Sequence, residues 1–281
     1  MQKGTSHKAI FGALISILCC NASLRADEAT PAAERRYSAD VSLNYARSTA
    51  SPSTADFSES WGVNYGLAWK AGDGFDLGFK SAFNREIGAA EEKFRAGNSQ
   101  IYLASRPPET DEPTSYGWTT GVVLPTAEDD KEYLGFQGSM LAGGSVTRSL
   151  SGSTITWLAP LSIGSKARGS RSFYSYDANK AGRPNTLWSL SLGGFISYQL
   201  SDPLSFSASL DNTRAWNSNG GSGTDSFEFS AGFDYAVNDK LSIGISEVTS
   251  NRTFAYDRVT PNLALYDSRL SAVVTSVSYR L

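Results

Sequence analysis

From Phe57 to Trp69 the chain alternates large apolar or aromatic residues with small or polar ones. The large residues stand at odd positions, interrupted only by Glu59: Phe57, Trp61, Val63, Tyr65, Leu67 and Trp69. Because successive side chains of a β-strand point to opposite faces, this pattern predicts a strand with one apolar face and one polar face.

The same alternation recurs along the rest of the chain, whereas patterns with a helical period are nearly absent. We predict an all-β protein with about twelve antiparallel strands, within a range of 10 to 14. The predicted strands cover residues 37–48, 57–70, 75–87, 98–106, 115–124, 134–148, 153–165, 186–200, 204–216, 225–237, 241–249 and 266–281.

Short and long connections alternate between these strands. Turn residues follow the second, sixth, eighth and tenth strands, at positions 71–74, 150–152, 201–203 and 238–240. Longer polar loops follow the others, and the longest cover 166–185 and 250–265. Two features depart from the scheme: a long connection at 106–113, and Pro160 inside the seventh predicted strand.

The first 26 residues have the organisation of a secretory signal peptide. A basic start precedes an apolar stretch from Ala9 to Cys20 that is too short to span a membrane as a helix. We predict cleavage after Ala22 or Ala26, a short periplasmic segment at 27–36, and one domain at 37–281. Cleavage would remove both cysteines and the only histidine, so we expect no disulfide and no metal or cofactor site built on these residues.

The charge of the expected mature chain argues against a nucleic-acid partner. The leader carries three of the 25 basic residues and none of the 28 acidic ones, which leaves a formal charge of about −6. No apolar run beyond the leader reaches the length of a transmembrane helix. An exported chain of this kind is a soluble periplasmic protein, a secreted protein, or a barrel whose lipid-facing residues alternate with inward ones.

Two features make the chain resemble bacterial outer-membrane β-barrels: a repeated hairpin pattern and the ending of the last strand. The hairpin around Ser201–Pro203 shares its pattern of aromatic, Asp turn and renewed alternation with the hairpin around Asn238–Lys240. The last strand alternates to the end of the chain through Val277, Tyr279 and Leu281. This ending is similar to the signal that the family's assembly machinery selects, although the family's usual last residue is Phe or Trp.

The resemblance implies a transmembrane antiparallel up-and-down barrel in the bacterial outer membrane, with both termini at the periplasmic, short-turn end. It also implies three partners: membrane lipid, lipopolysaccharide and the assembly machinery. A second likeness, to outer-membrane transporters of aromatic or hydrophobic compounds, rests on residues 121–126 and the acidic loop that follows.

Aromatic residues lie near the predicted strand ends, where amphipathic rings favour the level of the lipid headgroups. We interpret the following residues as an aromatic girdle: Tyr45, Trp69, Trp118, Trp188, Tyr198, Trp216 and Tyr235.

An enzymatic function is not favoured. The outer-membrane phospholipases and the omptin-type proteases resemble this chain in size, but both need a histidine. Asp129 and Asp130 are adjacent, and a solvated loop explains them better than catalysis or weak binding of a divalent ion. A hydrolase without histidine stays as a minor alternative.

The inward face carries the candidate functional residues. The alternation predicts a lining rich in Ser and Gly, with these charged residues: Asp76, Lys80, Glu86, Arg106, Asp211, Glu228 and Asp234. A barrel of twelve strands whose inward side chains are this small favours a narrow aqueous passage.

The predicted loop from residue 166 to 176 combines cations with aromatic residues. Lys166, Arg168 and Arg171 would either form a constriction within the pore or belong to a surface loop that is solvated or contacts lipopolysaccharide.

We therefore expect an outer-membrane channel that allows passive diffusion of small solutes. One alternative is a structural or surface-interaction barrel with a blocked lumen, and another is a transporter for aromatic or hydrophobic compounds. The sequence does not define the solute.

Overall fold

The structure is a computed structural model, and it describes residues 36–54, 56–72, 74–87, 94–106, 113–150, 161–253 and 264–281. The predicted signal peptide and its cleavage sites lie outside the described residues. The strands are β1 (Tyr37–Ser48), β2 (Glu59–Gly72), β3 (Phe75–Ile87), β4 (Arg95–Ala96), β5 (Ser99–Ser105), β6 (Thr114–Leu124), β7 (Phe136–Ser149), β8 (Leu161–Tyr174), β9 (Thr186–Ser201), β10 (Leu204–Asn217), β11 (Ser222–Ala236), β12 (Leu241–Arg252) and β13 (Ser271–Arg280).

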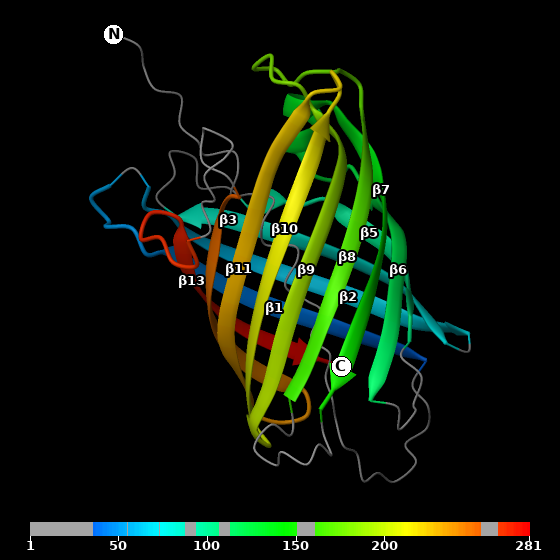
Figure 1. Cartoon of the computed structure of the whole chain (residues 1–281), viewed down its shortest axis with the longest axis vertical. Helices are drawn as coiled ribbons and strands as arrows, with labels where there is room; N and C mark the ends of the chain where they lie inside the picture. Colours follow the sequence, from blue (N-terminus) through cyan, green and yellow to red (C-terminus); the bar gives the residue numbers. More distant parts are fainter. Residues whose placement is uncertain are drawn as a thin grey trace.

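The strands form one closed antiparallel barrel (Figure 1). Each strand pairs with its neighbours in sequence, and β1 closes the ring by pairing with β13. The two-residue β4 pairs only with Phe83 and Asn84 of β3, directly beyond the end of β5, so β4 and β5 together occupy one of twelve positions. The prediction of a twelve-stranded antiparallel barrel is confirmed.

In a closed barrel every strand has hydrogen-bond partners on both sides. The backbone N–H and C=O groups are therefore paired within the sheet, as a chain that crosses lipid requires. In Figure 1 the strands β8–β11 run steeply in front, and β1 and β2 cross behind them at a large angle. This crossing is the tilt that closure of a sheet into a barrel requires. Among the described residues, none of the helices has the length and apolarity to span a membrane.

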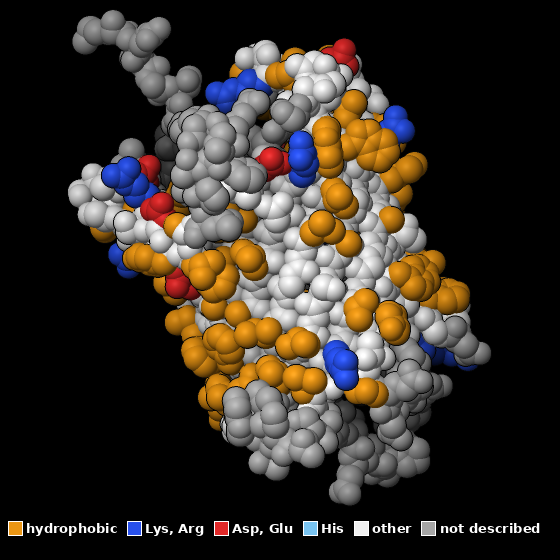
Figure 2. All heavy atoms as spheres, viewed as in Figure 1, with side chains coloured by type: hydrophobic (Ala, Val, Ile, Leu, Met, Phe, Trp, Pro, Cys, Tyr) orange, Lys and Arg blue, Asp and Glu red, His pale blue; other side chains and the backbone are white. Residues whose placement is uncertain are grey.

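The alternation sorts the side chains as predicted. Paired residues of neighbouring strands share a face, and one face carries large exposed apolar side chains such as Val41, Leu67 and Leu192, which are 46%, 55% and 56% exposed. The other face carries small buried ones such as Ser42, which is 6% exposed. Figure 2 shows apolar side chains spread over the outside of the barrel, where lipid would contact them.

The largest difference from the sequence prediction concerns β8. We predicted a strand at 153–165 and a loop from residue 166, whereas β8 runs from Leu161 to Tyr174. Residues 151–160, which include most of the predicted strand at 153–165 and most of the predicted tight turn at 150–152, lie outside the described residues. Pro160, the second departure noted in the sequence, is among them.

Short and long connections mark the two ends of the barrel. At the short-turn end, Gly74 joins β2 to β3 with a φ of 97°, and Asn238 Oδ1 accepts the N–H groups of Lys240 and Leu241 at 2.9 and 3.0 Å between β11 and β12. At the long-loop end lies a single π-helical turn, η3 (Asp130–Leu134). The connection after β10 is shorter than predicted, because β11 begins at Ser222.

Candidate functional site: the lumen of the barrel

The inward face of the barrel is lined mainly by serine and glycine. In register across β9 to β12, the small inward residues include Ser189, Ser191, Gly193, Ser205, Ser207, Ser209, Ser230, Gly232, Ser242 and Gly244. Their hydroxyls bond across strands, as Ser209 Oγ and Ser230 Oγ do at 3.1 Å. These short side chains keep to the wall.

Four of the larger inward side chains lie against the wall over glycines of the adjacent strand. Tyr102 covers Gly78, Phe195 covers Gly164 and Asp211 covers Gly193, so that a Cβ atom at any of these glycines would collide with the side chain above it. Asp40 lies over Gly66 in the same way, with Oδ1 2.5 Å from the place of a Cβ atom. The glycines therefore let bulky side chains lie flat.

A charged row crosses the lumen wall from β8 to β11. Lys166, Gly193, Asp211 and Glu228 are paired in register, and Lys166 Nζ reaches across Gly193 to Asp211 Oδ2 at 2.8 Å. The side chains of Lys166 and Asp211 are 34% and 15% exposed. Two carboxyl groups and one ammonium group thus lie on one strip of wall.

A second row on the opposite wall has a similar order. Arg280, Asp40, Gly66 and Lys80 are paired in register across β13, β1, β2 and β3, again with an Asp lying over the glycine. Here the lysine Nζ lies 5.5 Å from the centre of the Tyr102 ring.

The remaining predicted lumen residues occupy inward positions at three places. Asp76 lies at the short-turn end of β3, and Arg106, which directly follows β5, donates from Nη2 to Asp76 Oδ1 at 2.5 Å. Asp234 is paired between Ser205 and Gly244. Glu86 is paired with Ser60 near the long-loop end of β3, and its side chain is exposed.

The predicted loop residues 166–174 belong to a strand, which corrects our loop interpretation. Lys166 and Arg168 are paired with the inward Ser145 and Gly143 of β7, respectively, and face the lumen, whereas Arg171 faces outward. The alternation is hidden here because the outward residues are as small as the inward ones, and only pairing with β7 and β9 defines the strand.

Further charged residues lie on the inward face that the sequence pattern does not single out. Asp40, Lys70, Arg252 and Arg280 share the inward face by register, and Asp40 is paired with Arg280. The alternation within β1, β2, β12 and β13 could have identified these four residues. Each lies an even number of positions from an inward serine or glycine of its own strand, so its side chain points to the same face.

The predicted girdle residues lie on the outer face in two groups. Trp69, Trp118, Tyr198 and Tyr235 are toward the short-turn end, and Tyr45, Trp188 and Trp216 toward the long-loop end. Val277 and Tyr279 also point outward on β13, and Leu281 donates its backbone N–H to Ala39 O at 2.9 Å.

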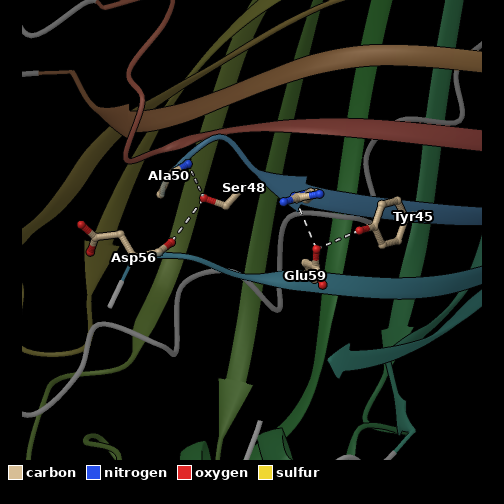
Figure 3. A network of polar contacts seen from close by, with 6 residues as sticks. Tyr45, Ser48, Ala50, Asp56 and Glu59 are labelled. Atoms are coloured by element: carbon tan, nitrogen blue, oxygen red, sulfur yellow. Dashed lines mark hydrogen bonds and ion pairs between the residues drawn. The ribbon is translucent and has the colours of Figure 1, made fainter. Parts of the chain in front are cut away.

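Figure 3 shows a polar network where β1 and β2 meet at the long-loop end. Glu59 Oε1 accepts a hydrogen bond from the Tyr45 hydroxyl at 3.0 Å and forms an ion pair with Arg47 Nε at 3.4 Å. Ser48 Oγ bonds to Asp56 O at 3.3 Å and accepts the N–H of Ala50 at 3.0 Å. The network explains Glu59 on an otherwise apolar face, because it lies at the rim and its charge is neutralised.

The acidic pair of the loop before β7 is anchored to the segment before β5. Asp129 Oδ2 lies 2.8 Å from Arg95 Nη1, and Asp130 Oδ2 accepts from Asn98 Nδ2 at 2.5 Å. Burial raises the pKa of the Asp130 carboxyl, the Asn98 hydrogen bond lowers it, and the Asp129 charge raises it again. The described residues contain no group of three or more His, Cys, Asp or Glu side chains that could hold a metal ion.

Comparisons with solved structures identify the fold. An outer membrane channel from Pseudomonas putida F1 aligns over 90% of this chain and 100% of its own, with a TM-score of 0.59 and 11% identity. The NanC porin aligns over 86% of this chain and 100% of its own, with a TM-score of 0.55 and 11% identity. No protein-family model and no curated protein sequence matches. The chain thus has the fold of bacterial outer-membrane channels and porins.

Proposed function

We propose that this protein is a passive channel for small polar solutes in the bacterial outer membrane. One observation carries the proposal: the bulky inward side chains lie flat over glycines of the next strand, as Tyr102 does over Gly78 and Phe195 over Gly164. A barrel of twelve strands is wider than the eight-stranded barrels that side chains fill. A wall of serine, glycine and flattened side chains favours a water-filled passage.

The polarity of the wall supports the same function. Asn64 Oδ1 and Asn84 Oδ1, both at inward positions, are buried and accept no hydrogen bond from the described part of the chain. Buried acceptors of this kind require a donor, and water in a lumen supplies one. Inward charges of both signs would make the passage suitable for hydrated solutes rather than for aromatic or hydrophobic compounds.

The orientation follows from the ends of the barrel. We assign the short-turn end to the periplasm and the long-loop end to the cell surface, as is usual for bacterial outer-membrane barrels. The signal peptide at residues 1–26 would direct export, and no catalytic step belongs to the proposal.

Conductance measurement tests the proposal directly. The folded protein in a planar lipid bilayer should give discrete current steps, and liposomes that contain it should swell in small sugars. Folding is checked by heat-modifiable gel mobility. Folded protein that gives no steps, in liposomes that stay tight to sugars, would contradict the channel and favour the blocked-lumen alternative. Flux of aromatic compounds without sugar flux would favour the hydrophobic transporter.

A further inference from the structure

Two arginines on the outer face of β8 and β10 lie over aromatic rings at the long-loop end. Arg171 Cζ lies 5.0 Å from the centre of the Trp188 ring and 5.4 Å from that of Phe173. Arg214 Cζ lies 5.6 Å from the centre of the Trp216 ring. Figure 2 shows cationic and apolar side chains next to one another toward the upper end of the barrel.

Register places this group on the lipid-facing side. Arg171 is paired with Trp188, Trp188 with Trp216, and Arg214 with the exposed Leu190. The two arginines are separated by the one strand β9 and are offset by two residues along it, so their backbones lie about 12 Å apart on the sheet. Long arginine side chains can converge on one headgroup over that distance.

The charge of this group is only partly compensated. Arg171 is exposed and forms no ion pair with another described residue. Arg214 is paired with Asp225, but the Nε–Oδ1 distance is 3.8 Å and the arginine side chain is 54% exposed. By contrast, Arg47 at the same end of the barrel lies closer to its carboxylate, Glu59, with an Nε–Oε1 distance of 3.4 Å.

A shallow apolar groove lies between the two tryptophans. Trp188, Leu190, Trp216 and Gly169 contribute to its lining, and Gly169 leaves it open toward β8 because it carries no side chain. The groove therefore joins an apolar surface to two guanidinium groups at the rim of the membrane.

We propose that this surface binds a phosphorylated glycolipid of the outer leaflet, of the lipid A type. Arg171 and Arg214 would bind the phosphates, since guanidinium groups match phosphate geometry with two parallel hydrogen bonds. Trp188 and Trp216 lie where amphipathic rings favour the headgroup level, and an acyl chain follows the groove over Gly169. The inference rests on the outer-membrane fold and on the orientation assigned above, not on the channel function.

The test measures binding of fluorescent lipid A to the folded full-length protein in detergent micelles. The double variant Arg171→Gln, Arg214→Gln should bind at least about tenfold more weakly, because each lost charged hydrogen bond contributes roughly that factor or more. Dephosphorylated lipid A should bind the unaltered protein similarly weakly, and inorganic phosphate at the same concentration should not compete. Gly169→Leu should weaken binding by filling the groove.

Arg148→Gln is the matched control, because Arg148 is an exposed outward arginine at the short-turn end. It should leave lipid A binding unchanged, and none of the variants should alter single-channel conductance. Equal binding by the double variant, or by dephosphorylated lipid A, would overturn the proposal. If the double variant changes the oligomeric state of the lipid-free protein while lipid A binding stays intact, this face would instead be assigned to contacts between copies of the chain. If the double variant fails to fold, the comparison of the two lipids on unaltered protein still decides.

Discussion

Lys166 Nζ lies 2.8 Å from Asp211 Oδ2 although the two residues belong to strands that are not neighbours. The ion pair crosses β9 at Gly193, the one residue type that leaves room for the Asp211 side chain there. Glu228 follows on the next strand, in register with Asp211. The lysine is thus the compensating charge for two carboxylates on the same strip of lumen wall.

Replacing Lys166 by Ala should make the channel more selective for cations. The substitution leaves Asp211 and Glu228 without their nearest ammonium group, so the wall attracts cations more strongly and repels anions. We expect the permeability ratio of potassium to chloride to rise by about twofold or more. The reversal potential in a salt gradient measures it.

Lys131→Ala is the control for Lys166, because Lys131 lies in η3 outside the strands and is exposed. It removes the same charge from the protein and should leave the reversal potential unchanged. An unchanged potential for Lys166→Ala as well would show that ions do not pass this strip of wall.

Gly193→Ala should destabilise the barrel and disturb the ion pair. A Cβ atom there would collide with the Asp211 carboxylate and would lie 3.0 Å from Leu210 O. Overpacking of this kind costs about 1–3 kcal/mol of unfolding free energy. Denaturant unfolding of the protein in lipid vesicles measures that cost.

The adjacent glycine offers a matched control. A Cβ atom at Gly194 would point outward and meet only Gly164 O at 3.6 Å, an ordinary contact. Gly194→Ala should therefore change the unfolding free energy by less than about 0.5 kcal/mol. Equal effects of the two substitutions would show that Gly193 has no special place in the wall.

Most strands of this chain can be predicted from the sequence, because the lipid-facing residues are large wherever the alternation is clear. Leu190, Leu192 and Ile196 of β9 illustrate this, each facing outward and each at least 41% exposed. The position of β8 is not predictable in this way, because Ser165, Ala167 and Gly169 are small outward residues and the strand is defined by its hydrogen bonds to β7 and β9.

The lumen contacts could be predicted only in part. The alternation of side chains alone places Asp211 and Glu228 on one face, but it predicts a loop at their partner Lys166. Which residues meet across strands depends on register, and register follows from turns and closure rather than from any one strand. The rim group of Arg171 and Trp188 escaped prediction for the same reason, since the two are paired by register across β8 and β9.

Leu67→Arg should strongly destabilise the barrel in a bilayer. Leu67 is 55% exposed on the outer face of β2, so the guanidinium would enter the hydrocarbon region. The expected loss of unfolding free energy is about 1–3 kcal/mol, because Leu67 lies two residues from the girdle residue Trp69, between the headgroup level and the midplane. Denaturant unfolding in vesicles measures it. Ala68→Arg places the same charge one residue further, on the inward face, and should cost less. A larger cost for Ala68→Arg would mean that the two faces are assigned the wrong way round.

Acidification should tighten the contact between the loop before β7 and the segment before β5. Burial raises the pKa of Asp130 above the ordinary value of 3.8, so the folded loop holds the proton more tightly than the unfolded chain does. The resulting stabilisation is complete below the unfolded pKa and is lost as the pH rises through the folded pKa. Hydrogen exchange of residues 125–135 should therefore be slower near pH 4 than near pH 7, after correction for the intrinsic exchange rate.

Asp130→Asn should remove this dependence on pH and slow exchange at neutral pH. The amide oxygen can still accept the Asn98 hydrogen bond, while the buried charge and its repulsion from Asp129 are gone. Asp129→Asn is the control: Asp129 is mostly exposed, and its surface ion pair with Arg95 contributes less than about 1 kcal/mol. That variant should keep the slowing of exchange on acidification. If exchange in Asp130→Asn still varies with pH as in the unaltered protein, Asp130 is not the titrating group.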